Sequence, residues 1–296
     1  MSISDSTPPL TLGALLKQDS RRFEDALHHD SATARIEVQC LLQAVLGVNR
    51  AYLLTHPERI LTALESARYG ELFARRLNGE PIAYLLGERE FFGLSFMVTP
   101  DTLIPRPDTE LLVEMALQHI PAGGAVLDMG TGSGAIAISI AHERPDALVV
   151  ALDASEAALI VARENAQRLQ IKNVQLLHSD WFAQLADEKF DLIVSNPPYI
   201  EADDVHLSQG DVRFEPLSAL ASGDDGLDDI RRIVVEAKSH LNAGGWLMFE
   251  HGYNQAARVR ELLQVAGFFG VSSVLDLSGI ERVTQGRLDP EAVVQG

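Results

Sequence analysis

The sequence predicts an α/β protein in two parts, a small N-terminal helical bundle followed by a larger domain on a mostly parallel β-sheet. From about residue 10 to 86 the chain is rich in Ala, Leu, Glu and Arg, and its apolar residues recur with helical periodicity. From about residue 125 onward, short apolar runs alternate with helical segments, which is the order of elements that builds a parallel sheet. A length of 296 residues also exceeds what one compact core usually contains, so two domains are expected.

We place the domain boundary after residue 86, so that residues 1–86 form the helical domain and residues 87–296 the rest. The sequence around Asp30 is typical of a helix start. Residues 88–104 alternate apolar and polar around Gly93, which predicts a β-hairpin that links the two domains. The helical domain carries no catalytic constellation, so we interpret it as a substrate-recognition module, with a purely structural cap as the alternative.

The sheet domain begins with a glycine-rich loop. An apolar strand ending at Met129 is followed by Gly130, Thr131, Gly132, Ser133 and Gly134, and then by an apolar helix. Glycine lets the chain turn tightly and lets a ligand approach the main chain, and the helix N-terminus offers free N–H groups. The G-x-G-x-G spacing differs from the dinucleotide fingerprint, and no phosphate-binding lysine follows it. We therefore expect these five residues to bind a nucleoside without a pyrophosphate, of which S-adenosylmethionine is the common one.

The next two apolar runs also end in residues suited to a nucleoside. Asp153 lies about 20 residues past the glycines, where an acid binds ribose hydroxyls in nucleotide-binding α/β folds. Asp153 could also cap the following helix, with Ser155 as an alternative cap. Farther on, Asp180 could accept a hydrogen bond from an adenine amine, and Trp181 could pack against the ring or simply fill the core. Asp153, Asp180 and Trp181 are thus expected to complete the cofactor site.

A turn of unusual composition, Asn196-Pro197-Pro198-Tyr199, follows the apolar run 190–195. The two prolines fix two φ angles and remove two N–H donors, so the backbone there offers carbonyl acceptors in a rigid turn. The Asn196 side chain adds an acceptor and Tyr199 adds a flat aromatic face. All four residues are expected to bind a planar group that carries an NH2, either a carboxamide or the exocyclic amine of a base.

These motifs follow successive strands, and the carboxyl ends of parallel strands meet at one edge of a sheet. We therefore expect a single crevice in which Asn196, Pro197 and Tyr199 are catalytic and Asn196 also contacts the cofactor. The Asn196 side-chain oxygen and the Pro197 carbonyl would hold the NH2 in line with a methyl donor. An amide nitrogen is a poor nucleophile, so positioning would matter more than acid–base catalysis.

In these motifs, the chain resembles the bacterial N5-glutamine methyltransferases that modify peptide-chain release factors, the HemK/PrmC family. Met129 and His251 depart from the residues that the family usually has at these positions, Leu and an aliphatic residue respectively. Beyond the glycine loop and the Asn-Pro-Pro-Tyr turn, the resemblance rests on residues 79–87, 91–93, 103–110, 214–216, 219–220, 225–227, 244–245, 250–252 and 255, and on Asp276, Gly279, Arg282, Val283, Gly286 and Arg287.

The resemblance implies a fold, a cofactor and a substrate. The fold would be a seven-stranded, Rossmann-like class I methyltransferase sheet whose last strand is antiparallel. The reaction would be S-adenosylmethionine-dependent N5-methylation of the glutamine in the Gly-Gly-Gln loop of release factors, which supports translation termination. Release factors would therefore be the protein partners.

Charge, cysteine and histidine content indicate which partners, metal sites and compartments the sequence disfavours. The formal charge of −18 would repel duplex nucleic acid on average, although a local basic patch could survive, so we expect no direct nucleic-acid binding. Cys40 is the only cysteine, which excludes an internal disulfide, and the nine histidines show no metal-binding pattern, so no metal is expected. Neither a signal peptide nor a membrane span is evident, and we expect a cytoplasmic monomer without membrane contact.

Three other functions stay open at this point. An N-methyltransferase acting on an exocyclic amine of DNA or rRNA would use the same Asn-Pro-Pro-Tyr turn. A nicotinamide oxidoreductase would share the glycine loop and Asp153 but would not explain that turn. A non-catalytic S-adenosylmethionine binder would keep the loop and Asp153 without needing Asn196. The long acidic segment 201–225 is interpreted as a lid over the substrate, because such loops are often functional.

Overall fold

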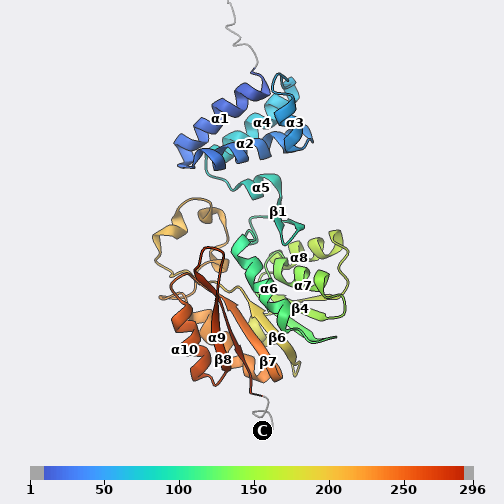
Figure 1. Ribbon diagram of the computed structural model, residues 1–296, viewed down its shortest axis with the longest axis vertical. Helices are drawn as coiled ribbons and strands as arrows, with labels where there is room; N and C mark the ends of the chain where they lie inside the picture. The colour runs from blue at the N-terminus through green and yellow to red at the C-terminus, as the bar shows by residue number, and fades with distance from the viewer. Residues whose placement is uncertain (1–9, 290–296) are drawn as a thin grey trace, which may run out of the picture. The chain divides into compact units, whose positions relative to one another are not determined.

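A computed structural model describes residues 10–289, which divide into two units (Figure 1). Residues 10–87 and 209–214 form a helical unit, and residues 88–208 and 215–289 form a sheet unit. No helix within this described range has the length and apolarity that a membrane crossing requires. The first residues, where the sequence predicts no signal peptide, lie outside the described range.

The helical unit is built by five described helices, of which the first four have side-chain N-caps and the fifth has none. Asp30 accepts the backbone N–H groups of Ala32 and Thr33, which confirms the helix start predicted there. Thr62 and Glu65 satisfy each other's backbone N–H groups in a capping box. The helices are α1 (Leu12–Leu27), α2 (Ser31–Leu46), α3 (Arg50–Thr55), α4 (Ala63–Leu77) and α5 (Ile82–Leu86). Their core includes Leu12, Phe23, Val38, Leu41, Leu42, Leu53, Tyr69 and Phe73.

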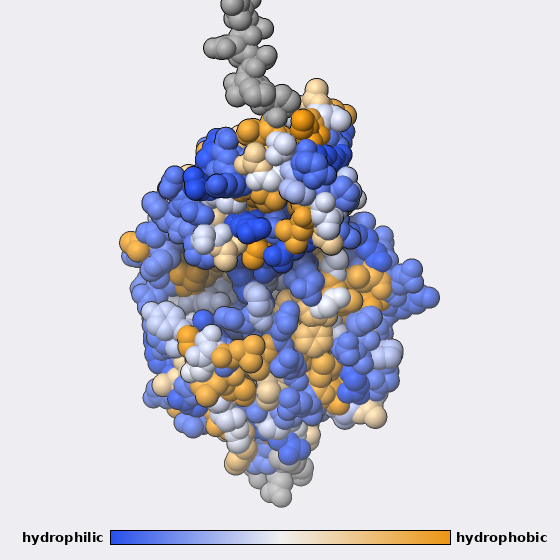
Figure 2. Space-filling model, turned by 45° about the horizontal axis from the view of Figure 1, so that its top comes forward, coloured by the Kyte–Doolittle hydropathy of each residue, from blue (hydrophilic) through white to orange (hydrophobic). Residues whose placement is uncertain are grey.

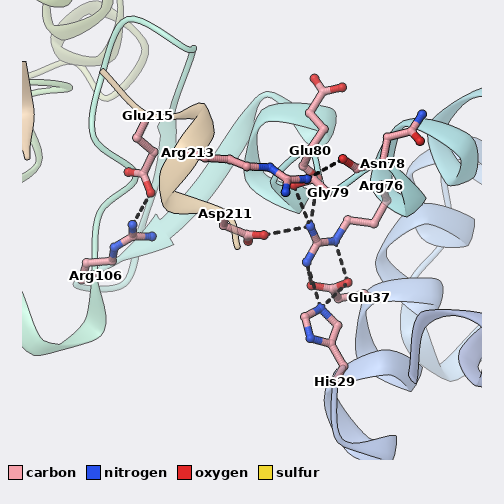
Figure 3. A network of polar contacts seen from close by, with 10 residues as sticks. All are labelled: His29, Glu37, Arg76, Asn78, Gly79, Glu80, Arg106, Asp211, Arg213 and Glu215. Atoms are coloured by element: carbon pink, nitrogen blue, oxygen red, sulfur yellow. Dashed lines mark hydrogen bonds and ion pairs between the residues drawn. The ribbon is translucent and has the colours of Figure 1, made fainter. Parts of the chain in front are cut away.

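A buried arginine on α4 organises the polar interior of this unit (Figure 3). Arg76 is 1% exposed, and its guanidinium binds both carboxylate oxygens of Glu37 on α2, at 2.8 and 3.0 Å. It also donates to the carbonyls of Gly79 and Glu80 and contacts the ring of His29 at 2.9 Å. The charge is therefore paired and hydrogen-bonded, as burial requires.

The same arginine fastens the short segment Gln209–Phe214 to the helical unit. Asp211 Oδ1 accepts from Arg76 Nη1 at 2.8 Å, and Arg213 donates to the Asn78 carbonyl at 2.7 Å (Figure 3). This segment lies inside the stretch 201–225, which the sequence predicts to be a lid over the substrate. Six residues of that stretch belong to the helical unit, where charged side chains far apart in the sequence pair.

The predicted hairpin, β1 (Glu88–Phe91) and β2 (Leu94–Met97), belongs to the sheet unit. Asn165 of α8 (Glu156–Arg168) accepts from the Met97 N–H at 2.7 Å and donates to the Met97 carbonyl at 2.9 Å. The division between the units therefore falls between residues 87 and 88, close to the expected boundary.

The sheet has seven strands in the order β5-β4-β3-β6-β7-β9-β8, as the predicted fold class requires. All neighbours are parallel except β9, which is antiparallel to both β7 and β8. The strand order reverses direction between β3 and β6, which makes a topological switch point there. The strands are β3 (Ala125–Met129), β4 (Leu148–Asp153), β5 (Val174–His178), β6 (Phe190–Ser195), β7 (Leu241–Glu250), β8 (Phe269–Leu275) and β9 (Glu281–Arg287).

Helices cover both faces of this sheet, and the alternating side chains of the strands pack against them. On one face, Val126, Val149 and Leu192 join residues of α6 (Glu110–His119), α7 (Ala135–Glu143) and α8 in one core. On the other, Leu127, Val150 and Ile193 join residues of α9 (Asp228–Ala237) and α10 (Ala256–Val265) in a second.

One predicted boundary is wrong. The sequence suggests a helix over 226–242 and a strand from 245, whereas α9 ends at Ala237 and β7 begins at Leu241. The pair Gly244-Gly245, which resembles a loop, lies within the strand where the register with β6 shifts. A Cβ on Gly245 would crowd the carbonyls of Phe190 and Asp191, so glycine permits this close approach.

Replacing Glu37 by Met should destabilise the helical unit by about 3 kcal/mol, because the substitution removes the carboxylate that neutralises a buried guanidinium. Urea unfolding followed by far-UV circular dichroism should show an earlier transition. The fluorescence of Trp181 and Trp246, both in the sheet unit, should respond less. Glu156→Gln, in an exposed ion pair with Arg163, is the control and should change little. An unchanged helical transition in Glu37→Met would contradict the prediction.

Candidate functional site

A cavity of about 480 Å³ lies in the sheet unit at the carboxyl ends of the central strands. The sequence-predicted residues Gly130, Gly132, Asp153, Asp180, Trp181, Asn196 and Pro198 all line it. Its other lining residues, which the sequence reasoning did not assign to the site, are Pro100, Asp101, Thr102, Leu103, Leu152, Ala154, Ser155, Ala158, Ser179, Pro216, Ser218, Ala219 and Asp229. The expected convergence of four motifs on one crevice is therefore observed, and two further segments complete its wall.

The conformation of the glycine loop is fixed by backbone hydrogen bonds to β4. Gly130 and Thr131 both donate their N–H groups to the Leu152 carbonyl at 2.9 Å, which ties the loop to β4. Gly130, Gly132 and Gly134 all adopt positive φ, the region that glycine occupies without strain. Gly134 is the N-cap residue of α7 and contributes no side-chain hydrogen bond to that helix terminus.

Asp128, directly before the loop, fixes the loop to α7 from inside the protein. Its Oδ2 accepts from the Thr131 hydroxyl at 2.6 Å and from the Ala137 N–H at 3.2 Å. Complete burial raises the pKa of Asp128 to about 7, while these two hydrogen bonds oppose the rise. Its Oδ1 has no hydrogen-bond partner among the described residues. The sequence reasoning gave this residue no role, although its position beside the glycines is a usable signal.

Asp153 is pinned at the wall of the cavity. Its Oδ2 accepts from the Gly132 N–H and its Oδ1 from the Ser155 N–H, both at 2.8 Å. Ser155, rather than Asp153, caps α8 by accepting from the Ala158 N–H, which decides between the two caps that the sequence allows. Burial raises the pKa of Asp153. Each carboxylate oxygen keeps a further lone pair that can accept from a ligand.

Asp180 and Trp181 lie at the same wall in different surroundings. The Asp180 carboxylate is 63% exposed and forms a two-pronged ion pair with Arg232 of α9, at 2.9 and 3.2 Å. Trp181 has a φ of 50°, and the Ser179 hydroxyl donates to its carbonyl at 2.6 Å. Its ring lies against Gly130, where a Cβ would be 3.7 Å from two ring carbons. Trp181 therefore packs on the apolar core and faces the cavity at once.

The turn after β6 presents an unpaired acceptor. Asn196 Nδ2 donates to the Thr109 hydroxyl at 3.2 Å, and its Oδ1 is buried without a partner in the described part of the chain. A buried polar atom without a partner is costly and unusual in a folded protein. Pro198 lines the cavity and Pro197 is buried behind it.

Tyr199 is held on three sides. Its N–H donates to the Leu220 carbonyl at 3.1 Å, and its carbonyl accepts from Gln255 Nε2 at 3.0 Å. Its hydroxyl lies 3.4 Å from Glu250 Oε1. A Cβ on Gly226 would overlap the Tyr199 carbonyl, so glycine is required there. The turn is thus rigid, and Tyr199 itself is absent from the lining of the cavity.

Taken together, the crevice offers a glycine-lined wall, a fixed carboxylate, an aromatic face and an unpaired side-chain carbonyl oxygen. These groups suit an uncharged or cationic nucleoside on one side and an N–H donor on the other. Within residues 10–289, no group of three His, Cys, Asp or Glu side chains is placed to hold a metal ion.

Comparison with known proteins shows which family the chain resembles. Residues 14–87 match the PrmC N-terminal domain, and residues 107–212 match the Methyltransferase small domain. The chain is 53% identical to the release factor glutamine methyltransferase of Pseudomonas aeruginosa over 266 residues, covering 90% of this chain and 96% of that protein. It is 54% identical to the protein of the same name from Burkholderia pseudomallei over 261 residues, covering 86% of this chain and 92% of that protein.

The fold agrees with a solved structure as well. A methyltransferase from Pyrococcus furiosus superimposes with a TM-score of 0.52 at 21% identity, covering 73% of this chain and 97% of that one. This likeness concerns the fold alone, and it confirms the predicted methyltransferase sheet. The family assignment rests on the identity of more than half of the aligned residues to the two release factor glutamine methyltransferases, over most of the chain. The chain belongs to the release factor glutamine methyltransferase family.

Proposed function

We propose that this protein transfers a methyl group from S-adenosylmethionine to the side-chain nitrogen of the glutamine in the Gly-Gly-Gln loop of peptide-chain release factors. Its relatives in the family support the reaction and the substrate class. The observation that carries the proposal is Asn196 Oδ1, a buried acceptor without a partner among the described residues, on a side chain that lines the cavity. An incoming amide NH2 would satisfy it.

The residues of the crevice fit the cofactor. The loop Gly130–Gly134 would bind its methionine end, because its positive-φ glycines let a ligand approach the main chain closely, and Asp153 would accept from its ribose hydroxyls. Trp181 would pack on the adenine ring, and Asp180 would accept from its amine with the lone pairs that Arg232 leaves free. S-adenosylmethionine supplies an electrophilic methyl group when it is bound.

The turn residues would hold the target. Asn196 Oδ1 and the Pro197 carbonyl would accept the two N–H groups of the glutamine amide, which orients its nitrogen toward the methyl donor. An amide lone pair is delocalised into its carbonyl, so the enzyme's contribution is positioning. The N–C bond would form as the sulfonium S–C bond breaks, and the methylated amide nitrogen would then lose a proton to water, so no base is needed. Tyr199 would pack against the amide plane and is already fixed by its backbone bonds.

The remaining parts of the proposal concern recognition and setting. The helical unit would bind the release factor outside its Gly-Gly-Gln loop, and parts of segment 201–225 would cover the bound loop. We further propose that the protein works in the cytoplasm as a monomer and does not bind nucleic acid directly. The formal charge of −18 supports the last point, because it disfavours a polyanionic partner.

Asn196→Ala should lower kcat by about a hundredfold or more, because the target amide loses a preorganised acceptor. The dissociation constant for S-adenosylmethionine should change much less. Transfer of labelled methyl to purified release factor measures the first quantity, and calorimetric titration measures the second. The matched control is Asn242→Ala. Asn242 lies at the N-terminal end of β7, at the edge of the sheet away from the cavity, so this variant should keep its turnover. Near-normal turnover in Asn196→Ala would reject the assignment.

Asp153→Asn should weaken S-adenosylmethionine binding by about tenfold or more, since hydrogen bonds to a charged acceptor contribute about 1.5–3 kcal/mol. Calorimetric titration of the purified variant measures this, and a thermal melt checks that the glycine loop is intact. Asp146→Asn changes an exposed aspartate that pairs with Arg144 and should bind the cofactor normally. An unchanged affinity in Asp153→Asn would remove Asp153 from the cofactor site.

A further inference from the structure

A buried polar chain leads from Asn196 away from the cavity. Asn196 Nδ2 donates to the hydroxyl of Thr109, which lies in the 3-10 turn Pro107–Thr109 before α6. The Thr109 hydroxyl in turn interacts with the carboxyl of Glu250, the last residue of β7, whose buried Oε2 has no partner in ordinary hydrogen-bond geometry among the described residues and is open to that hydroxyl's proton. The Tyr199 hydroxyl reaches the same carboxyl at 3.4 Å. Thr109 is 4% exposed and Glu250 is 2% exposed, so water does not compete at these contacts.

The register of the sheet explains why these groups meet. Ser195 of β6 is paired with Phe249 of β7, so the residues that follow, Asn196 and Glu250, lie side by side at the carboxyl edge. Successive side chains of a strand point to opposite faces. Phe249 packs in the core on the α9 and α10 side, which turns Glu250 toward the face that α6 covers, where Thr109 lies.

The chemistry of these groups decides which of them donates and which accepts in each hydrogen bond. A carboxylate only accepts hydrogen bonds, whereas a hydroxyl has one proton to donate and lone pairs with which to accept. With its proton directed to Glu250, the Thr109 hydroxyl can only accept from Asn196. The Asn196 amide must then turn its NH2 to Thr109 and its oxygen away from it. The flipped amide would offer a donor to a substrate NH2 that is itself a donor.

We propose that Glu250, acting through Thr109, is a positioning residue that fixes the Asn196 side chain with its oxygen toward the target amide. This inference rests on the proposed function and names the residues that orient its central acceptor. Through the Tyr199 hydroxyl, the same carboxylate also holds the other end of the Asn196–Tyr199 turn. Neither Thr109 nor Glu250 lines the cavity, so both act through the residues that do.

The charge state of Glu250 decides whether Thr109 donates its proton to Glu250 and accepts from Asn196. Burial raises the pKa of Glu250 to about 7, and nearby Asp108 raises it further, while Thr109, Arg282 and Tyr199 oppose the rise. Arg282 is shared with Asp276 at 3.2 Å and Asp108 at 3.5 Å. Burial also raises the pKa of Tyr199, which therefore stays a phenol donor at neutral pH. A protonated Glu250 could donate to Thr109 and reverse the chain, so turnover should fall as the pH drops below about 7.

The test compares Thr109→Val, Thr109→Ser and Glu250→Gln with the wild type, using purified full-length protein, labelled S-adenosylmethionine and release factor. Thr109→Val should lower kcat by about tenfold to a hundredfold, the size of effect expected from a misplaced reacting group. Its dissociation constant for S-adenosylmethionine should stay within about twofold, because Thr109 does not line the cavity. Thr109→Ser keeps the hydroxyl and should restore most of the turnover. Thermal melts show whether each variant is folded.

Glu250→Gln adds a readout that a structural role would not produce. It should lower kcat at pH 8 and abolish the loss of turnover that the wild type shows below about pH 7. The pKa of Asp128 is raised to the same range, and this residue is present in both proteins. A loss of turnover at low pH that survives in Glu250→Gln would therefore come from a group other than Glu250, and it would overturn the inference.

The remaining outcomes separate the inference from the function on which it rests. Full turnover in Thr109→Val and Glu250→Gln, together with an inactive Asn196→Ala, would overturn the inference and leave the proposed function standing. Equal losses in Thr109→Ser and Thr109→Val would also overturn it, because the hydroxyl would then not be what matters. A wild-type protein that never methylates release factor would overturn both.

Discussion

The parallel registry of the central strands is the constraint on which the rest of this structure depends. Leu177, Leu152, Met129, Ser195 and Phe249 form one row across β5, β4, β3, β6 and β7. The residues directly after this row include Asp153, Gly130, Asn196 and Glu250. A shift of one residue in any pair would turn those side chains to the wrong face. The bond from the Ser195 hydroxyl to the Met129 carbonyl, at 2.7 Å, adds a side-chain link within that row. Backbone pairing in the core thus sets the spacing of the chemical groups at the edge.

This constraint also explains how far the sequence could predict the site. The glycine loop, Asp153 and the Asn-Pro-Pro-Tyr turn each follow a recognisable apolar run, and the rule that parallel strands share an edge brings them together without any structure. Pairings between distant residues have no such local signal. Arg232 meets Asp180 across 52 positions, and Thr109 meets Asn196 across 87. Gly244-Gly245 looks like a loop locally, yet strand pairing on both sides keeps it in β7.

The segment between Ser208 and Glu215 shows the same limit on a larger scale. It lies within the acidic stretch 201–225, whose composition predicts a lid, but Asp211 is held by a buried guanidinium of the helical unit. Glu215, four positions later, belongs to the sheet unit, where it accepts from the Ile104 N–H at 3.0 Å and pairs with Arg106 (Figure 3). Figure 2 shows hydrophilic and hydrophobic residues intermixed on the face that it displays. A segment with two such anchors is unlike a free flap, and any motion of it must involve the helical unit.

The charges around the crevice pose a last physical problem. A sulfonium cofactor is a cation, and an acidic protein attracts it. Charge that binds the cation as strongly before transfer as during it would add affinity without adding rate. The structure moderates that charge instead. Asp180 is neutralised by Arg232, Asp153 shares its oxygens with two backbone amides, and burial keeps the pKa of Asp128 near 7. Among the neutral groups that line the crevice, Asn196 has a buried oxygen without a partner in the described residues, and under the proposed function its interaction with an amide NH2 would grow as that nitrogen gains positive charge in the transition state. Under that proposal, the Asn196 oxygen acts on the reacting nitrogen, whereas the moderated carboxylates act on the cofactor.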